Sequence, residues 1–390
     1  MDYIYGPQLL VAVFYCQIPL LMNELTYILG AGASYQSIPI VKTFSNRFNE
    51  FVQSISQSFL NDVEIAKEES KKVFQAQLEQ FQLEIKSHYS FDTYFKKLYH
   101  TSSEEKIIVA KKILNLYFLW EHFQIPTGFK QNTDSRGNDL TTNVDVNDFT
   151  KQSQLDKRYD ALIAGLIKPI KGEINFFTKV NFISWNYDLN LFLSLKNFLS
   201  GDSTLGNYLS EISSEGSNTW KCGKDINVVN MNGFFYSEWL KGLHTFDFRN
   251  SNKVFKDFFS NGYDIEKNIL DADAQNINFA WDNDSNLDNE DKIVKAVNTI
   301  ARSKTIIVIG YTFPLYNRLV DLKYFNANQL VGKKLIIQDP NAEQIEKDII
   351  ANFSIGQGYK GAVNIVLKTN CDNFFIPNNV FDFDDSVRSL

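Results

Sequence analysis

The sequence predicts an α/β protein with a doubly wound parallel sheet of the Rossmann-like type, and three observations support this prediction. A short apolar run at 27–29 ends in a glycine pair, Gly30 and Gly32, and helical periodicity follows soon after. Continuous apolar runs at 304–309 and 334–338 have the pattern of strands buried on both faces. Such strands alternate with helical segments through the C-terminal half, as expected for parallel strands joined by crossover helices.

Length and composition bound the protein class. The chain has 390 residues, 44% of them hydrophobic and 22% charged, and a formal net charge of -7. This composition fits a globular protein large enough for two domains, and the charge argues against a protein that coats nucleic acid. The three cysteines, Cys16, Cys222 and Cys371, lie too far apart for a zinc knuckle. We therefore expect no metal and a reducing, cytoplasmic location.

Residues 1–21 are predicted to be an N-terminal extension outside the core fold. The segment 9–22 is mostly apolar, but it is too short to span a bilayer, so we expect no membrane partner. It also lacks the positively charged start of a secretory signal. Met22 directly precedes the first strand, and residues 22–59 are predicted to be the first part of the nucleotide-binding domain.

The loop after the first strand is a candidate phosphate cradle. It reads Gly30, Ala31, Gly32, Ala33 and Ser34. Gly30 permits a tight turn, Gly32 lets the backbone approach a pyrophosphate, and Ser34 offers a hydroxyl donor. The third glycine of the dinucleotide fingerprint is missing, so an ordinary strand-turn-helix corner explains the stretch equally well. Pro39 suits the entry to the helix predicted over 41–59.

A helical insertion is predicted over 60–172, between the first strand-helix unit and the next strand. Helical segments are expected at 61–86, at 91–99 with Ser90 as the N-cap, from 104 onwards, and at 148–170. A polar stretch at 128–147 reads as a surface loop. The insertion is either a scaffold that covers the sheet, or a lid over a ligand or an oligomer face; the sequence leaves these alternatives open.

The core domain is predicted to resume over 173–233. The strand 180–184 runs into Asn186 and Asp188, and a helix is expected at 189–199. A short strand at 226–229 is followed by Asn230. Residues 234–289 are aromatic and rich in Asn and Asp, and they are predicted to form an irregular subdomain.

The segment 290–390 is predicted to complete the sheet. After a helix at 291–303, the strand 304–309 ends in Gly310, Tyr311 and Thr312. The strand 334–338 ends in Asp339 and Asn341, a helix follows at 342–352, and the last strand is expected at 363–367. Asp339 either accepts hydrogen bonds from ribose hydroxyls or shapes the turn before Pro340.

Four strand ends thus carry groups suited to a ligand. The carboxyl ends of parallel strands meet at one edge of an open α/β sheet, which is where such sheets bind ligands. Together the four strand ends indicate dinucleotide binding.

The ordered motifs 30–34, 38–39, 185–188 and 310–314 resemble the sirtuin-type NAD-binding domain. More narrowly, they resemble the sirtuin-like NAD-cleaving effectors of bacterial antiphage defence. The resemblance covers the core strands from Met22 to about Leu367. It implies that NAD lies across the strand ends and that the nicotinamide–ribose bond is cleaved through an oxocarbenium-like state, giving nicotinamide and ADP-ribose.

The resemblance also implies roles and partners. Asn186 corresponds to the asparagine that positions the ribose or the attacking water, and Asp188 to the acidic partner that shapes the pocket. Such effectors form homo-oligomers, and some act with a helicase-like ATPase encoded beside them.

The sequence departs from the family pattern in two places. Asn230 stands where the family has its catalytic histidine, and asparagine cannot act as a general base at neutral pH; His244 could take the role if the alignment slips. The four-cysteine zinc module of protein-deacylating sirtuins is absent, which favours NAD hydrolysis over deacylation. Two hypotheses follow: an NAD hydrolase of antiphage defence, or a catalytically weak NAD or ADP-ribose sensor or scaffold subunit.

Overall fold

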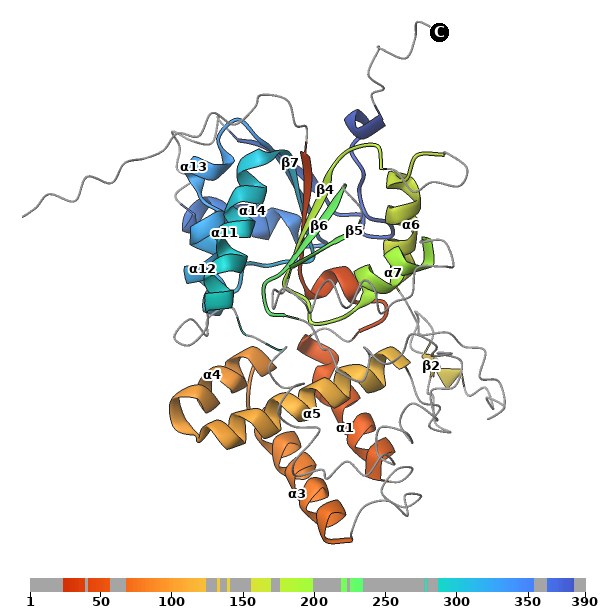
Figure 1. The fold of residues 1–390 in the computed structure, drawn as a ribbon, viewed down its shortest axis with the longest axis vertical. Helices are drawn as coiled ribbons and strands as arrows, with labels where there is room; N and C mark the ends of the chain where they lie inside the picture. The colour runs from red at the N-terminus through yellow and green to blue at the C-terminus, as the bar shows by residue number, and fades with distance from the viewer. Residues whose placement is uncertain are drawn as a thin grey trace, which may run out of the picture.

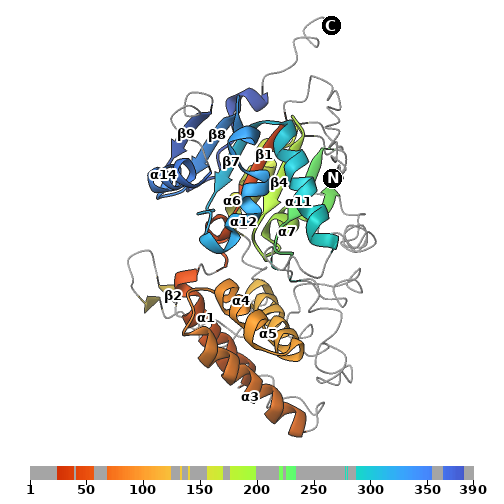
Figure 2. The ribbon, with the colours of Figure 1, turned by 90° about the vertical axis from the view of Figure 1, so that its left-hand side faces the viewer.

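The computed structural model shows a sheet flanked by helices, with a second group of helices beyond one edge of the sheet (Figures 1 and 2). It describes residues 24–38, 41–56, 68–123, 132–133, 139–140, 156–169, 176–198, 219–222, 225–233, 277, 279, 287–353 and 363–381. The predicted extension 1–21, Pro39, His244 and most of the predicted subdomain 234–289 lie outside these residues.

The sheet has seven strands in the order β5-β6-β4-β1-β7-β8-β9. Their bounds are β1 Glu24–Leu29, β4 Val180–Ser184, β5 Thr219–Cys222, β6 Ile226–Asn230, β7 Ser303–Ile309, β8 Lys334–Gln338 and β9 Asn364–Lys368. The central strand β1 pairs in parallel with β4 and β7. The edge strand β5 runs antiparallel to β6, and the other neighbours pair in parallel.

The strand order confirms the predicted doubly wound sheet. When the parallel strands are numbered along the chain, their spatial order is 3-2-1-4-5-6, which is the order of the dinucleotide-binding α/β fold. The order reverses between β1 and β7. Ligands of this fold bind outside the carboxyl ends of the strands at that point. The chain therefore has a Rossmann-like α/β fold with its switch point beside the loop 30–34.

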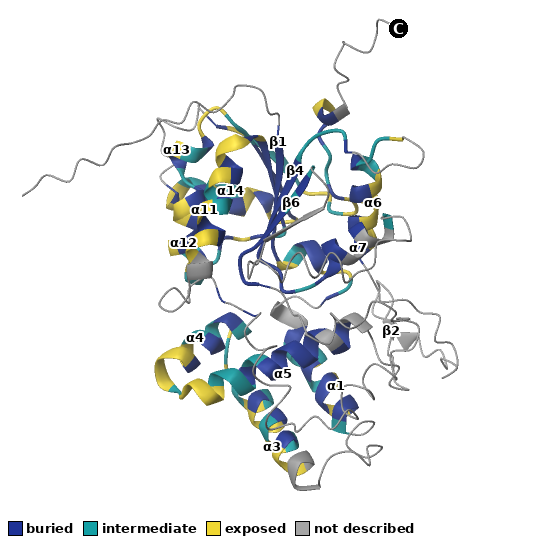
Figure 3. Cartoon of the chain, viewed as in Figure 1, coloured by how far each residue is buried: buried dark blue, intermediate teal, exposed yellow. Residues whose placement is uncertain are grey.

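Helices cover both faces of the sheet (Figure 1). They are α6 Lys157–Leu166 and α7 Asn190–Phe198 on one face, and α11 Leu287–Arg302, α12 Arg318–Tyr324, α13 Ala327–Leu330 and α14 Ala342–Asn352 on the other. Successive side chains of β1 enter two separate cores. Tyr27 packs with α6 and α7, whereas Ile28 packs with α11, α12 and α14. The strands β1, β4, β6, β7 and β8 are largely buried on both faces, as Figure 3 shows in dark blue for β1, β4 and β6, and their apolar sequences follow from this.

A helical layer, formed by α1, α3, α4 and α5, lies beyond the carboxyl edge of the sheet (Figures 1 and 2). Its bounds are α1 Val41–Ser54, α3 Glu68–Ile85, α4 Phe91–Thr101 and α5 Glu104–Phe123. It has an aromatic core in which Phe48 contacts Phe51, Phe81 and Tyr117. Ser90 caps α4 as predicted, because its hydroxyl accepts a hydrogen bond from the Thr93 amide.

Helix α6 falls within the range predicted as an insertion, but it packs on the sheet face beside α7. A two-stranded hairpin, β2 Asn132–Thr133 and β3 Asp139–Leu140, falls within the predicted polar loop. Three short 3-10 turns complete the described elements: η1 Ala31–Ser34, η5 Leu315–Asn317 and η6 Asn378–Phe381. Among the described helices, none is both long and apolar enough to cross a membrane.

Candidate functional site at the carboxyl edge of the sheet

The loops after β1 and β7 interlock at the switch point through glycines. A Cβ atom on Gly310 would lie 2.4 Å from the Ala33 nitrogen, and one on Gly30 would lie 2.5 Å from the Gly310 oxygen. Gly310 also has a φ of +58°, in the left-handed region that glycine adopts more easily than residues with a Cβ atom. The glycines at these strand ends are therefore required for the two loops to meet.

This packing engages the loop amides that were predicted to cradle a phosphate. The Gly30 amide donates to the Ile309 oxygen at 3.0 Å, the Gly32 amide to the Gly310 oxygen at 3.1 Å, and the Ala33 amide to the Gly30 oxygen at 2.8 Å. If these three amides bind a phosphate, as the sequence predicts, they must first leave their present partners, so the loop must rearrange when the ligand binds.

Polar side chains from the loops after β1 and β4 converge at this point. Asn186 donates from Nδ2 to Ser34 Oγ at 3.2 Å, and the same hydroxyl lies near enough to the Asp188 carboxyl to lower its pKa. The Asp188 Oδ1 accepts from both the amide and Nδ2 of Asn190, each at 2.9 Å. Tyr159 of α6 contacts the Ser34 hydroxyl, with 3.1 Å between the two oxygens. The structure thus brings together Ser34, Asn186 and Asp188, which the sequence placed on separate strand ends.

Burial sets the protonation of Asp188. It raises the pKa of the carboxyl above its ordinary value, while the hydrogen bonds from Ser34 and Asn190 lower it and offset part of the shift. A carboxylate with a raised pKa is a better proton acceptor than an exposed one. Asp188 therefore supplies a carboxylate beside Ser34 and Asn186 that accepts a proton more readily than an exposed aspartate.

Arg158 of α6 holds the loop 30–34 in place, a role that the sequence did not reveal. Its Nη2 donates to the Ala33 oxygen at 2.8 Å, and its Nη1 to the Cys371 oxygen at 3.2 Å. The guanidinium pairs with buried Asp156 and lies over the rings of Tyr35 at 4.3 Å and Phe374 at 4.8 Å. Because Asp156 balances its charge, Arg158 acts as a brace and offers no uncompensated charge to an anion.

The loop after β7 rests on a second buried network. Tyr311 stacks on Trp185 with 5.2 Å between ring centroids, and its hydroxyl donates to Asp321 at 3.0 Å. Tyr324 donates to the same carboxylate at 2.9 Å and accepts from Trp185 Nε1 at 2.9 Å. Tyr311, predicted to touch a cofactor, is therefore a buried support, whereas Thr312 is exposed.

The buried carboxyl of Asp321 should make stability depend on pH. Burial raises its pKa to about 7 from the ordinary 3.8, against hydrogen bonds from Tyr324 and Tyr311. Between these two values the folded state keeps a proton that the unfolded chain has released, so stability falls as pH rises from about 4 to about 7. The full loss is of order 4 kcal/mol, at about 1.4 kcal/mol per pKa unit.

Urea unfolding at pH 5 and pH 8 tests this prediction. The Asp321→Asn variant should lose less unfolding free energy between the two pH values than the parent chain, because it has no proton to release there. Equal losses in both proteins would show that Asp321 is already ionised when folded at pH 5.

Asn230, the residue in the predicted histidine place, ends β6 opposite Ser184 of β4. It is only 7% exposed, and its side-chain amide makes no hydrogen bond to another described residue. Asn232 lies nearby, and its Nδ2 donates to the Trp185 oxygen at 3.2 Å. His244, the alternative candidate, lies outside the described residues. His88 lies in the turn between α3 and α4, with its ring 5.4 Å from that of Tyr94.

Asp339 at the end of β8 forms the predicted turn, since its Oδ1 accepts from the Asn341 amide at 2.8 Å. Burial raises its pKa. The Asn341 side chain is exposed. The ribose contact proposed for Asp339 stays a prediction.

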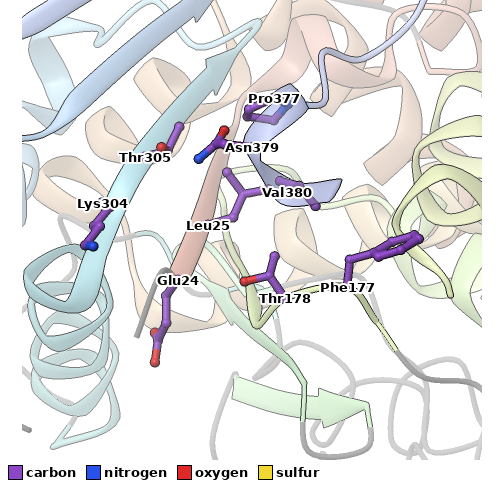
Figure 4. A pocket seen from close by; sticks show the side chains of 9 residues that line it. All are labelled: Glu24, Leu25, Phe177, Thr178, Lys304, Thr305, Pro377, Asn379 and Val380. Atoms are coloured by element: carbon purple, nitrogen blue, oxygen red, sulfur yellow. The ribbon is translucent and has the colours of Figure 1, made fainter. Parts of the chain in front are cut away.

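Other parts of the described structure offer weaker candidates for a functional site. No group of three or more His, Cys, Asp and Glu side chains within the described ranges could hold a metal ion. A cavity of about 130 Å³ opens at the opposite, amino edge of the sheet, lined among others by Glu24, Thr178, Thr305 and Asn379 (Figure 4). Glu24 there is already bonded to Asn181 and Arg302. The fold places its ligand edge at the other end of these strands.

The comparisons with known proteins give no identification. No protein-family model matches the chain. A search of the curated proteins finds no match either.

Proposed function

We propose that the chain is an NAD hydrolase that cleaves the nicotinamide–ribose bond and acts as a sirtuin-like effector of antiphage defence. One observation carries the proposal. At the switch point of a sheet with the dinucleotide-binding strand order, Asn186 from one strand end contacts Ser34 from its neighbour at 3.2 Å, and the carboxyl of Asp188 lies near the same serine. The sequence resemblance assigns roles to these residues.

The proposed reaction needs a group that stabilises positive charge on the ribose and a group that accepts a proton from water. Loss of nicotinamide leaves positive charge on the ribose, and a nearby carboxylate stabilises that charge. Asp188 supplies the carboxylate, and its raised pKa suits it to receive a proton from the attacking water. The Asn186 amide is positioned by Ser34 to hold the ribose or that water.

A second candidate, an NAD or ADP-ribose sensor with weak turnover, is favoured by a separate observation. The residue that ends β6 beside the site is Asn230, whose amide can bind a ribose hydroxyl but cannot take a proton. Its side chain makes no hydrogen bond to a described residue, so a ligand could use it.

Nicotinamide release distinguishes the two functions. Purified protein is incubated with NAD, alone and with candidate activators, and nicotinamide is followed by chromatography. We expect release by the parent chain and at least a 100-fold slower rate for Asn186→Ala, because one positioned donor contributes about this much. Asn352→Ala, at the exposed end of α14, is the control and should match the parent. Binding of NAD without release would support the sensor, and absence of both would refute the proposal.

A further inference from the structure

The helical layer is fastened directly to the loop that carries Asn186 and Asp188. Tyr187, between these residues, donates its hydroxyl to Asp92 Oδ1 of α4 at 2.7 Å. Its ring lies 5.3 Å from Phe91 and is stacked 5.6 Å from Phe118 of α5. The side chain is buried. The residue between two candidate site residues therefore belongs to the core of the helical layer.

A second contact joins the same helix to the other side of the switch point. Tyr316, in the turn after β7, has its hydroxyl near Ser90, the N-cap of α4, and near Asp92, and both affect the pKa of that hydroxyl. The beginning of α4 thus contacts the loops after both neighbours of β1. A shift of α4 would move these two loops together.

The Asp92 carboxyl is ionised at neutral pH, and this suits it to hold the hydroxyl of Tyr187. Burial raises its pKa to about 6, and the bond from Tyr187 lowers it in part. At pH 7.5 the carboxylate is therefore ionised and can only accept, so the tyrosine hydroxyl must point toward it. A charge-assisted bond of this kind is shorter and stronger than one between neutral groups, so it restrains the tyrosine hydroxyl in addition to the ring packing.

We propose that Asp92 is a positioning residue for the ligand site: through Tyr187 it holds the loop 184–190 in the conformation in which Asn186 and Asp188 meet Ser34. The helical layer then sets the geometry of the site in addition to covering it. The proposal rests on the proposed function for its ligand, but its structural part can be measured without any ligand.

Two amides of the loop report on its conformation. The Asn186 amide donates to Ser184 Oγ at 3.2 Å and the Asn190 amide to Asp188 Oδ1 at 2.9 Å. Hydrogen exchange of the peptide 184–190 is measured by mass spectrometry at pH 7.5, with the peptide 304–309 of the core strand β7 as the internal reference. We expect about tenfold faster exchange of the loop in Asp92→Ala and in Tyr187→Phe, and unchanged exchange of the reference.

Two further variants separate positioning from a general effect of helix charge. Asp92→Asn keeps an oxygen that accepts from Tyr187, and should restore exchange to within threefold of the parent. Glu343→Ala removes an acidic residue from the same position in the first turn of α14, where the side chain is exposed, and should leave the loop unchanged. If Asp92→Ala does not fold, Tyr187→Phe still tests whether the hydrogen bond holds the loop, because this substitution removes only the hydroxyl.

Two outcomes would overturn the proposal. Unchanged loop exchange in both Asp92→Ala and Tyr187→Phe would show that the ring packing alone holds the loop. Equal acceleration of the loop and of the β7 peptide would show only loss of global stability. In the nicotinamide assay, Asp92→Ala should lower kcat about tenfold with little change in KM. If the parent chain does not bind NAD, the exchange result still stands and only the proposed function fails.

Discussion

Replacing Gly310 with alanine is expected to remove NAD binding and to lower the free energy of unfolding by more than about 3 kcal/mol, of which the left-handed conformation alone accounts for about 1–2 kcal/mol. The added Cβ would lie 2.4 Å from both the Ala33 nitrogen and the Gly32 carbonyl carbon, and these are backbone atoms that cannot rotate away. The loops after β1 and β7 must then separate, breaking the Gly32–Gly310 hydrogen bond at 3.1 Å.

Gly332→Ala is the matched control for this experiment. Gly332 also has a positive φ, of +74°, but a Cβ there would meet nothing within 4 Å. This variant should therefore lose only the conformational term, about 1–2 kcal/mol, and should bind NAD like the parent. Urea unfolding and isothermal titration measure both quantities. Similar stability losses in the two variants would mean that the loops are not closely packed.

Replacing Arg158 with alanine is the second large expected effect, a loss of about 3–5 kcal/mol in unfolding free energy. The substitution leaves the Asp156 carboxylate buried without its partner, and an uncompensated buried charge has a cost of this size. It also removes the donors to the Ala33 and Cys371 oxygens. The loop 30–34 should loosen, so NAD affinity measured on the folded protein should fall.

The Arg47→Ala variant distinguishes a loss of stability from a loss of the contacts between Arg158 and the loop 30–34. Arg47 also makes a two-pronged bond to a buried carboxylate, Glu121, and lies over Trp120 at 4.7 Å, but it belongs to the helical layer. We expect it to destabilise the fold without weakening NAD binding in the protein that stays folded. If Arg158→Ala and Arg47→Ala weaken binding equally, Arg158 has no specific role at the loop.

The parallel strands could be predicted because their signal is local. The runs at 180–184, 304–309 and 334–338 are strands in the structure because burial on both faces requires continuous apolar sequence. The last strand was expected at 363–367, and β9 begins and ends one residue later. By contrast, β5 lies in a polar stretch, and α13 has four residues and too few turns to show a period.

The candidate site could be predicted only in part. Ser34, Asn186 and Asp188 are recognisable because they directly follow strands, whose ends converge in any parallel sheet. Arg158 is not, because its contacts with Ala33 and Cys371 join positions 125 and 213 residues apart in the chain. The packing of Gly30 against Gly310 depends on tertiary structure in the same way, so the sequence does not reveal that these glycines also bring the two loops together.

A crystal structure of the full chain with NAD tests directly where the dinucleotide binds. We expect the dinucleotide at the carboxyl edge, with its diphosphate beside the loop 30–34 and its nicotinamide ribose against Asn186 and Asp188. The same density would show whether Asn230 or His244 faces that ribose. NAD bound instead at the amino edge, in the cavity beside Glu24 and Asn379, or no bound NAD at saturating concentration, would show that the site proposed at the carboxyl edge is wrong.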